Sequence, residues 1–245
     1  MEELTLGDLD MVLISVAAAL AGGLVRGFAG MGGPAIMLLV LTQFYAPASV
    51  LGKVLIVDIV ANAWLIPSVT KEIQWKKALI IIGITVLFMP LGIWALVVVD
   101  ALVMKRIIAA IAGFAAIVLL IGWRYKSQPN LLAIVGAGIV SGLALGATYL
   151  ALLTWLFLHA GPDPARVSRV DGILWGFITS CAMIPALVVV DALSWTDVWR
   201  SLLVGLPYLA VTWFGARVFR GTTESIFHTV VLWLFLVLAV IGVFT

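Results

Sequence analysis

Charged side chains are scarce in this sequence. Asp, Glu, Lys and Arg make up 11% of its 245 residues, whereas roughly a quarter of the residues in a typical soluble domain are charged. The chain is 64% hydrophobic and has a mean hydropathy of +1.24. These values exclude an ordinary soluble domain. The net charge of +2 also gives no indication of a nucleic-acid partner, because the basic residues stand mostly at the ends of apolar segments.

Cysteine and histidine are nearly absent as well. Cys181 is the only cysteine, which excludes an intrachain disulfide and a thiolate metal cluster. The two histidines, His159 and His228, lie far apart and lack the spacing of metal ligands. No nucleophile–base pair is recognisable either. We therefore expect no metal, no cofactor and no enzymatic activity.

Long apolar runs are what the sequence has in abundance. A run of about 18 or more apolar residues is long enough to cross a bilayer as a helix. Such segments occur at about 11–43, 48–68, 78–98, 105–123, 130–158, 167–190, 199–218 and 226–244. The polar stretches between them are too short to fold separately. The sequence predicts an all-α polytopic membrane protein in which residues 1–245 form a single integral membrane domain in the lipid bilayer.

The eight apolar segments form two sets of four. The pattern Gly23-Leu-x-x-Gly27 in the first segment matches Gly142-Leu-x-x-Gly146 in the fifth, at a shift of 119 positions. Glycine-interrupted helices at matching places in two halves of a membrane protein point to the substrate site of a transporter. We therefore predict two four-segment repeats, each opening with a glycine-broken segment. The repeats cover about 8–124 and about 130–245.

The two broken segments can be threaded in two ways, and the distribution of charge distinguishes them. If each broken segment crosses the membrane once, six basic residues lie on each side, with Arg26 and Lys53 left out of the count. If each is a re-entrant hairpin, nine lie on one side and three on the other, which follows the positive-inside rule. The three are Lys105, Arg106 and Arg200. We therefore expect hairpins, inverted repeats, and both termini outside the cytoplasm.

The first broken segment holds the strongest candidate for a binding site. Pro34 suits the first turn of a helix, and a matching helix is expected to start near residues 147–148. Helix N-termini attract anions, and the guanidinium of Arg26 can grip an oxyanion. Two alternatives stay open: the glycines could be packing contacts, and Arg26 could extend to an interface. The residues predicted to bind substrate are Gly23, Arg26, Gly27, Gly30, Gly32, Gly33, Pro34, Gly142, Gly146, Thr148 and Tyr149.

Polar residues on the second and sixth segments form a second candidate group. Asp58 and Asn62 are four residues apart and hence share a helix face, and Ser180 is the counterpart of Asn62 in the repeat. Asp58 could carry or gate a coupling proton, or it could neutralise Arg26 or Lys53 between substrates. A purely structural salt bridge is the alternative. Asp171 could take part in coupling, or it could be an interfacial residue that pairs with Arg169. The residues predicted to take part in coupling or gating are Lys53, Asp58, Asn62, Ser180 and Asp171.

At these residues the sequence resembles the TauE/SafE family of sulfite and organosulfonate exporters. The resemblance rests on Gly-x-x-Arg-Gly-x-x-Gly-x-Gly-Gly from Gly23 to Gly33, on its weaker echo at Gly142–Gly146, and on the eight-segment repeat. It implies a secondary transporter in the bacterial inner membrane that exports a small anion such as sulfite, a sulfonate or a carboxylate. Coupling of this export to protons stays open. The second loop lacks the dense glycine run that is usual in the family and has Leu143, Leu145 and Ala147 instead, which favours an anion with an organic tail.

Two other functions stay open at this stage. An anion channel would conduct the same ions without depending on a proton gradient, and a non-transporting membrane assembly partner would move no solute. The sequence does not decide between a monomer and a homodimer.

Overall fold

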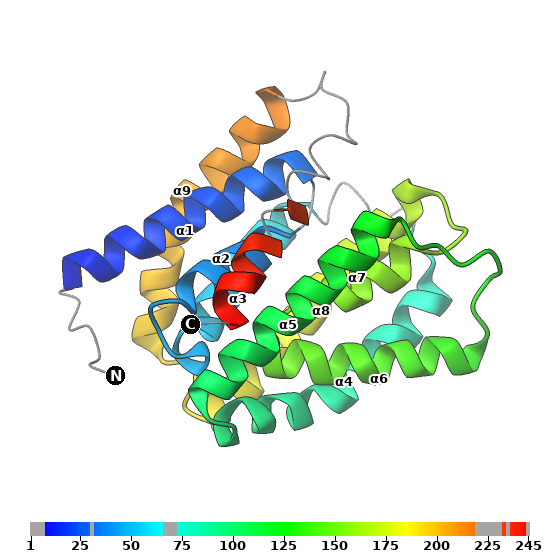
Figure 1. Ribbon diagram of the computed structural model, residues 1–245, viewed down its shortest axis with the longest axis horizontal. Helices are drawn as coiled ribbons and strands as arrows, with labels where there is room; N and C mark the ends of the chain where they lie inside the picture. Colours follow the sequence, from blue (N-terminus) through cyan, green and yellow to red (C-terminus); the bar gives the residue numbers. More distant parts are fainter. Residues whose placement is uncertain (1–7, 30–31, 66–72, 219–231, 234–235, 244–245) are drawn as a thin grey trace.

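The computed structural model describes residues 8–29, 32–65, 73–218, 232–233 and 236–243. Its helices are α1 (Asp8–Ala29), α2 (Gly33–Leu41), α3 (Pro47–Leu65), α4 (Trp75–Val98), α5 (Ala101–Ile121), α6 (Leu131–Thr148), α7 (Leu152–His159), α8 (Ala165–Val189) and α9 (Trp195–Val218). Residues 236–243 are also helical, and they lie beside α5 (Figure 1).

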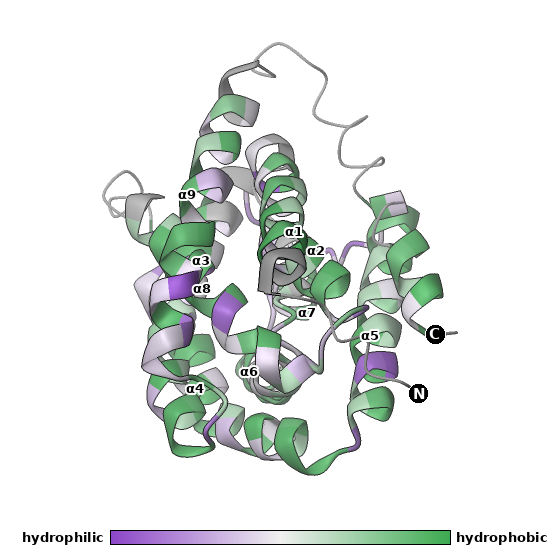
Figure 2. Ribbon diagram, turned by 90° about the vertical axis from the view of Figure 1, so that its left-hand side faces the viewer, coloured by the Kyte–Doolittle hydropathy of each residue, from purple (hydrophilic) through white to green (hydrophobic). Residues whose placement is uncertain are grey.

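Four helices of the described chain are long and apolar enough to span a membrane. They are α4, α5, α6 and the part of α8 from Val170 to Val189. Most of the helical ribbon has the colour of hydrophobic residues, and hydrophilic residues occupy only a few places in it (Figure 2). Exposed large apolar side chains at this frequency are unfavourable in water and favourable in lipid. The expectation of an all-α polytopic membrane protein is confirmed.

The first glycine-rich segment breaks where the sequence predicted, and α2 starts at Gly33 with Pro34 in its first turn, whereas the second breaks later in the chain than predicted. Helix α1 continues through its glycines to Ala29, which places Arg26 in its last turn. Helix α6 likewise continues through Gly146 to Thr148, and α7 begins only at Leu152. The predicted starting point of the second half-helix was therefore wrong. Glycine lowers helix propensity by only about 1 kcal/mol, which close packing against a neighbouring helix offsets.

The glycines in α1 and α6 let neighbouring backbones approach closely. A Cβ atom on Gly23 would lie 2.6 Å from the carbonyl oxygen of Tyr208 in α9. One on Gly142 would lie 2.6 Å from the carbonyl oxygen of Thr85 in α4. Small residues at helix interfaces allow this kind of contact in membranes, where packing rather than hydrophobic burial drives helix association. The glycines therefore hold α1 against α9 and α6 against α4.

In each of these two helix pairs, one helix comes from the first half of the chain and the other from the second half. A shift of 119 residues places the start of α2 on the start of α7, and it overlays α4 on α9 to within one residue. Helix α1 from the first half packs mainly on α9 from the second, and α6 packs mainly on α4. Each bundle therefore contains helices from both halves, and α3 contacts α8 between them.

In each of the two glycine-rich segments, residues before and after the break lie near one another. Ser15 near the start of α1 and Tyr45 after α2 line one cavity. Before α6, the Nε2 atom of Gln128 donates a hydrogen bond to Oδ1 of Asp163, which follows α7, at 2.8 Å. Helix α1 packs on α2, and α6 packs on α7.

Candidate functional site

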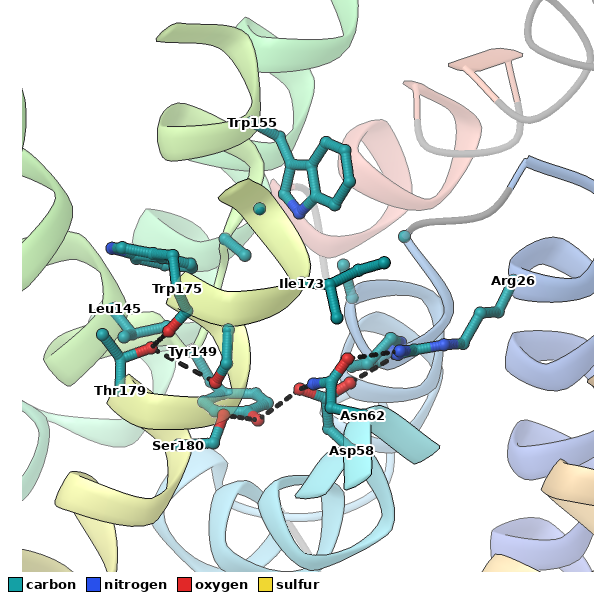
Figure 3. A pocket seen from close by; sticks show the side chains of 16 residues that line it. Arg26, Asp58, Asn62, Leu145, Tyr149, Trp155, Ile173, Trp175, Thr179 and Ser180 are labelled. Carbon is teal, nitrogen blue, oxygen red and sulfur yellow. Dashed lines mark hydrogen bonds and ion pairs between the residues drawn. The ribbon is translucent and has the colours of Figure 1, made fainter. Parts of the chain in front are cut away.

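Residues from both glycine-rich segments line a common cavity of about 60 Å³, which has room for a few water-sized groups. Figure 3 shows the side chains around it. They come from α1, α2 and α3 on one side and from α6, α7 and α8 on the other. We call this space the anion cavity. Its lining residues are Arg26, Gly32, Pro34, Ala35, Asp58, Asn62, Leu145, Tyr149, Ala151, Trp155, Gly172, Ile173, Trp175, Gly176, Thr179 and Ser180.

A buried ion pair forms the polar end of the anion cavity. The Nη1 atom of Arg26 donates to Oδ1 of Asp58 at 2.6 Å, and its Nη2 atom donates to Oδ1 of Asn62 at 2.6 Å. Nδ2 of Asn62 in turn donates to Oδ2 of Asp58 at 2.9 Å. Arg26 is 7% exposed and Asp58 8%. A charge this deeply buried needs a counter-charge, because desolvation costs several kcal/mol for each ion. Asp58 supplies it in this conformation.

Part of the Arg26 side chain is still available to another acceptor. Its Nε atom is buried and makes no hydrogen bond within the described part of the chain. The hydroxyl of Tyr208, from α9, is buried beside the guanidinium. A buried donor without an acceptor costs about 1–3 kcal/mol. The guanidinium is therefore positioned to accept a further oxygen ligand.

Tyr149 connects the two sides of the cavity. Its hydroxyl donates to Oδ2 of Asp58 at 3.1 Å and lies 3.0 Å from Oγ of Ser180 (Figure 3). Tyr149 ends α6 with a left-handed backbone, φ 52°, a conformation that costs a bulky residue about 1–3 kcal/mol. This turn directs the ring into the cavity instead of along the helix. A chain of polar contacts therefore runs from Arg26 through Asp58 and Tyr149 to Ser180.

The N-termini of α2 and α7 both face the anion cavity. Gly32 precedes α2 with φ 81°, a left-handed conformation that favours glycine, and it lines the cavity with Pro34 and Ala35. Ala151 lines it just before α7. The free N–H groups of a helix N-terminus and its partial positive charge favour an anion. The cavity thus combines a cation with two favourable helix ends.

The wall away from Arg26 is apolar and aromatic. It is formed by Leu145, Trp155, Ile173 and Trp175 (Figure 3). Trp175 is fixed by a hydrogen bond from its Nε1 to Oγ1 of Thr85 at 3.2 Å. This apolar part of the lining lies beside the hydroxyls of Tyr149, Thr179 and Ser180.

The structure brings seven of the predicted residues to the anion cavity. They are Arg26, Gly32, Pro34, Asp58, Asn62, Tyr149 and Ser180. Six others do not line it: Gly23, Gly27, Gly33, Gly142, Gly146 and Thr148. Gly33 instead packs on Gly22 of α1, and the hydroxyl of Thr148 donates to the carbonyl of Ala144 at 2.6 Å. Gly30 lies outside the described residues.

The remaining two predicted residues lie elsewhere. Lys53 contacts Asp197 of α9 at 3.8 Å, and Oδ1 of Asp171 accepts a hydrogen bond from the backbone N–H of Gln74 at 3.0 Å. Asp171 therefore caps the start of α4. The side chain of Arg169, its alternative partner, lies outside the described residues.

Sequence reasoning missed the aromatic part of the cavity. Tryptophans in membrane proteins are usually interface anchors, and nothing in the sequence separates Trp155 and Trp175 from the rest. One signal was available in α8, where Gly172, Gly176 and Ser180 recur every four residues and so share a face. A Cβ atom on Gly172 would lie 3.1 Å from the indole of Trp155. That small-residue face makes room for the aromatic wall.

Comparison with known proteins adds one match. A family model described as sulfite exporter TauE/SafE matches residues 15–241. The matched range includes every residue that lines the anion cavity. No curated protein and no solved structure matches the chain.

Proposed function

The matched range is nearly the entire chain, so this protein belongs to the sulfite exporter TauE/SafE family, and we propose on that basis that it is a secondary transporter that exports sulfite or an organosulfonate across a bacterial inner membrane. The resemblance seen in the glycine pattern is thereby confirmed at the level of the family. The single observation that supports the anion cavity as the substrate site is the buried Arg26, which is paired with a carboxylate in a cavity that two helix N-termini also line.

In this mechanism, Asp58 occupies the place of the substrate when no substrate is bound. A sulfite or sulfonate group carries oxygens that can replace the carboxylate of Asp58 on the guanidinium of Arg26. The carboxylate of Asp58 is then released from the guanidinium. Uptake of a proton by Asp58 would couple anion movement to the proton gradient.

Alternating access would separate the two sides of the cavity. Tyr149 and Ser180 come from the side that contains α6 and α8, whereas Arg26 and Asp58 come from α1 and α3. Rocking of the two bundles around a central site is a common way for repeat-built transporters to work. The exchange of α4 and α9 between the halves supports an inverted repeat, because each bundle then contains corresponding helices.

The arrangement of helix ends supports the re-entrant threading of the two hairpins. The segments before α6 and after α7 meet through Gln128 and Asp163, at the same end as Lys77, which contacts Asp163 at 2.6 Å. In the threading with nine basic residues on one side, this end is cytoplasmic. Both termini then lie in the periplasm.

The apolar wall supports a substrate with an organic tail. Leu145 is 2% exposed and lines the cavity, whereas Leu143 on the same helix is 40% exposed on the outer surface. Replacing Leu145 by Ala should change the ratio of the sulfoacetate and sulfite transport rates, because it enlarges the cavity at an apolar side chain and removes no polar group. Leu143→Ala is the matched control and should leave the ratio unchanged. An unaltered ratio in Leu145→Ala would argue against a tail subsite.

Substrate-induced current in liposomes tests the proposed function. The panel of anions is sulfite, sulfoacetate, taurine, sulfate, acetate and chloride, with and without a pH gradient. We expect current for sulfite or a sulfonate, loss of that current in Arg26→Gln, and no loss in Arg106→Gln, which removes an exposed cation of α5. The double variant Arg26→Gln/Asp58→Asn removes both buried charges, so it folds without an unpaired ion and should also be inactive.

The same measurement distinguishes the alternatives. An anion channel would show current that reverses at the equilibrium potential of the anion and ignores the pH gradient. An assembly partner would show no current for any anion while remaining folded and inserted. Either result would contradict proton-coupled export.

A further inference from the structure

Lys53 is a cation within an apolar helix, and it does not line the anion cavity. It stands in the apolar run of α3, yet it lines a second cavity between α1, α2, α3 and α9. Its ammonium lies 3.8 Å from the carboxylate of Asp197, and the two side chains are 30% and 28% exposed. Charged residues within membrane segments usually mark a ligand, a pathway or a partner. The distance to Asp197 is at the limit of an ion pair, so another anion can approach Lys53.

The second cavity is large and mostly apolar. Its volume is about 340 Å³, more than twice that of an engineered apolar cavity of about 150 Å³ that stays dry and binds benzene. Its apolar lining residues are Val12, Met37, Leu41, Val50, Val57, Leu203 and Val204. Val12 is 55% exposed and Leu203 70%, so the cavity opens on the outer surface of the helices. A hydrocarbon chain can enter it from the lipid.

The charge at this cavity is positive. Arg200 also lines it, is exposed, and makes no ion pair with any described residue. With Lys53 and Asp197, the net charge of the three groups is +1. Trp195 and Trp199 stand on the same first turns of α9, 72% and 58% exposed. Tryptophans in such positions anchor a helix at the membrane–water interface, where lipid headgroups lie.

We propose that this cavity is a binding site for an anionic phospholipid. The phosphate binds Lys53 and Arg200, and one acyl chain follows the apolar wall towards Met37 and Val57. A free inorganic anion would leave that wall without a ligand, and a zwitterionic lipid would gain less from the net positive charge. We name it the lipid cavity. It lies outside the anion cavity, and the proposal does not depend on the proposed function.

Lipid retention measured by native mass spectrometry tests the proposal. The purified protein is taken from vesicles that contain phosphatidylglycerol and phosphatidylcholine in equimolar amounts. We expect the wild type to retain phosphatidylglycerol preferentially. Lys53→Gln/Arg200→Gln should weaken this retention about 30-fold, since each basic residue near a membrane surface is worth about 1 kcal/mol. The matched control is Lys105→Gln/Arg106→Gln on α5, which removes the same charge elsewhere and should change nothing.

Two further variants separate recognition of the lipid from a general loss of structure. Asp197→Asn raises the net charge of the lipid cavity while keeping the side-chain shape, so retention of phosphatidylglycerol should become about fivefold stronger. Val204→Phe fills part of the apolar wall without changing charge and should weaken retention. Equal retention of the two lipids by the wild type would overturn the proposal, as would similar losses in the control variant or no gain in Asp197→Asn.

Discussion

Removal of the Asp58 charge is the most informative perturbation of the anion cavity. Asp58 accepts hydrogen bonds from Arg26, Asn62 and Tyr149 at 2.6, 2.9 and 3.1 Å. Asp58→Asn keeps the size of the side chain but leaves Arg26 as a buried cation without a counter-charge. Breaking a buried ion pair in this way costs about 3–5 kcal/mol. For a chain of this size, such a loss lowers the melting temperature by about 6–20 °C.

An anionic substrate should restore much of that stability. In the wild type, sulfite must displace the Asp58 carboxylate before it reaches the guanidinium, whereas in Asp58→Asn the guanidinium is free of that competitor. A ligand at about 100 times its dissociation constant stabilises the folded state by about 2.7 kcal/mol. We therefore expect sulfite to bind Asp58→Asn more tightly than the wild type and to raise its melting temperature by more.

Thermal unfolding of the detergent-purified protein, with and without sulfite, measures both effects. Asp191→Asn is the control, because it removes an exposed carboxylate that lies outside the anion cavity. Arg26→Gln should show no response to sulfite. Weaker binding of sulfite to Asp58→Asn than to the wild type would refute the reasoning, since Asp58 would then position Arg26 instead of competing with the substrate.

Two predictions concern packing and the charged loops at one end of the molecule. Gly92→Ala should destabilise the protein by about 1–3 kcal/mol, because the added Cβ overpacks α4 on α6. On the same helix, the Cβ of Gly83→Ala would meet nothing within 4 Å, so this control should be neutral or stabilising by up to about 1 kcal/mol. Denaturation of the two variants in detergent compares their stabilities. For Asp163, burial raises the pKa of the carboxyl group, but hydrogen bonds from Lys77 and Gln128 lower it by a larger amount. The pKa of Asp163 is therefore below its usual value. The stability from this carboxylate is therefore complete above roughly pH 3.9 and is lost as pH falls through the lower folded-state value; melting curves against pH should show that loss in the wild type and not in Asp163→Asn.

The sequence alone was sufficient for the helices and for the main charged residues of the anion cavity. A long apolar run forms a helix in lipid whatever surrounds it, because its backbone hydrogen bonds are satisfied within the segment. A charge in such a run is costly, so Arg26 and Asp58 stood out before any contact was known. The positions of the helix breaks were harder to predict from the sequence. Glycines both interrupt helices and allow close packing, and the sequence of α1 and α6 does not say which of the two applies.

The tertiary structure alone decided which residues meet. Asp58 had two candidate cations within reach along the sequence, and folding pairs it with Arg26 while Lys53 lies beside Asp197. Hydropathy likewise does not predict the exchange of α4 and α9 between the two bundles, nor the aromatic wall around Trp155. The physical reason is that helix formation in a membrane is local, whereas helix association depends on the fit of small side chains far apart in the sequence. Lipid-facing and protein-facing surfaces are both apolar, so their pattern carries little information about partners.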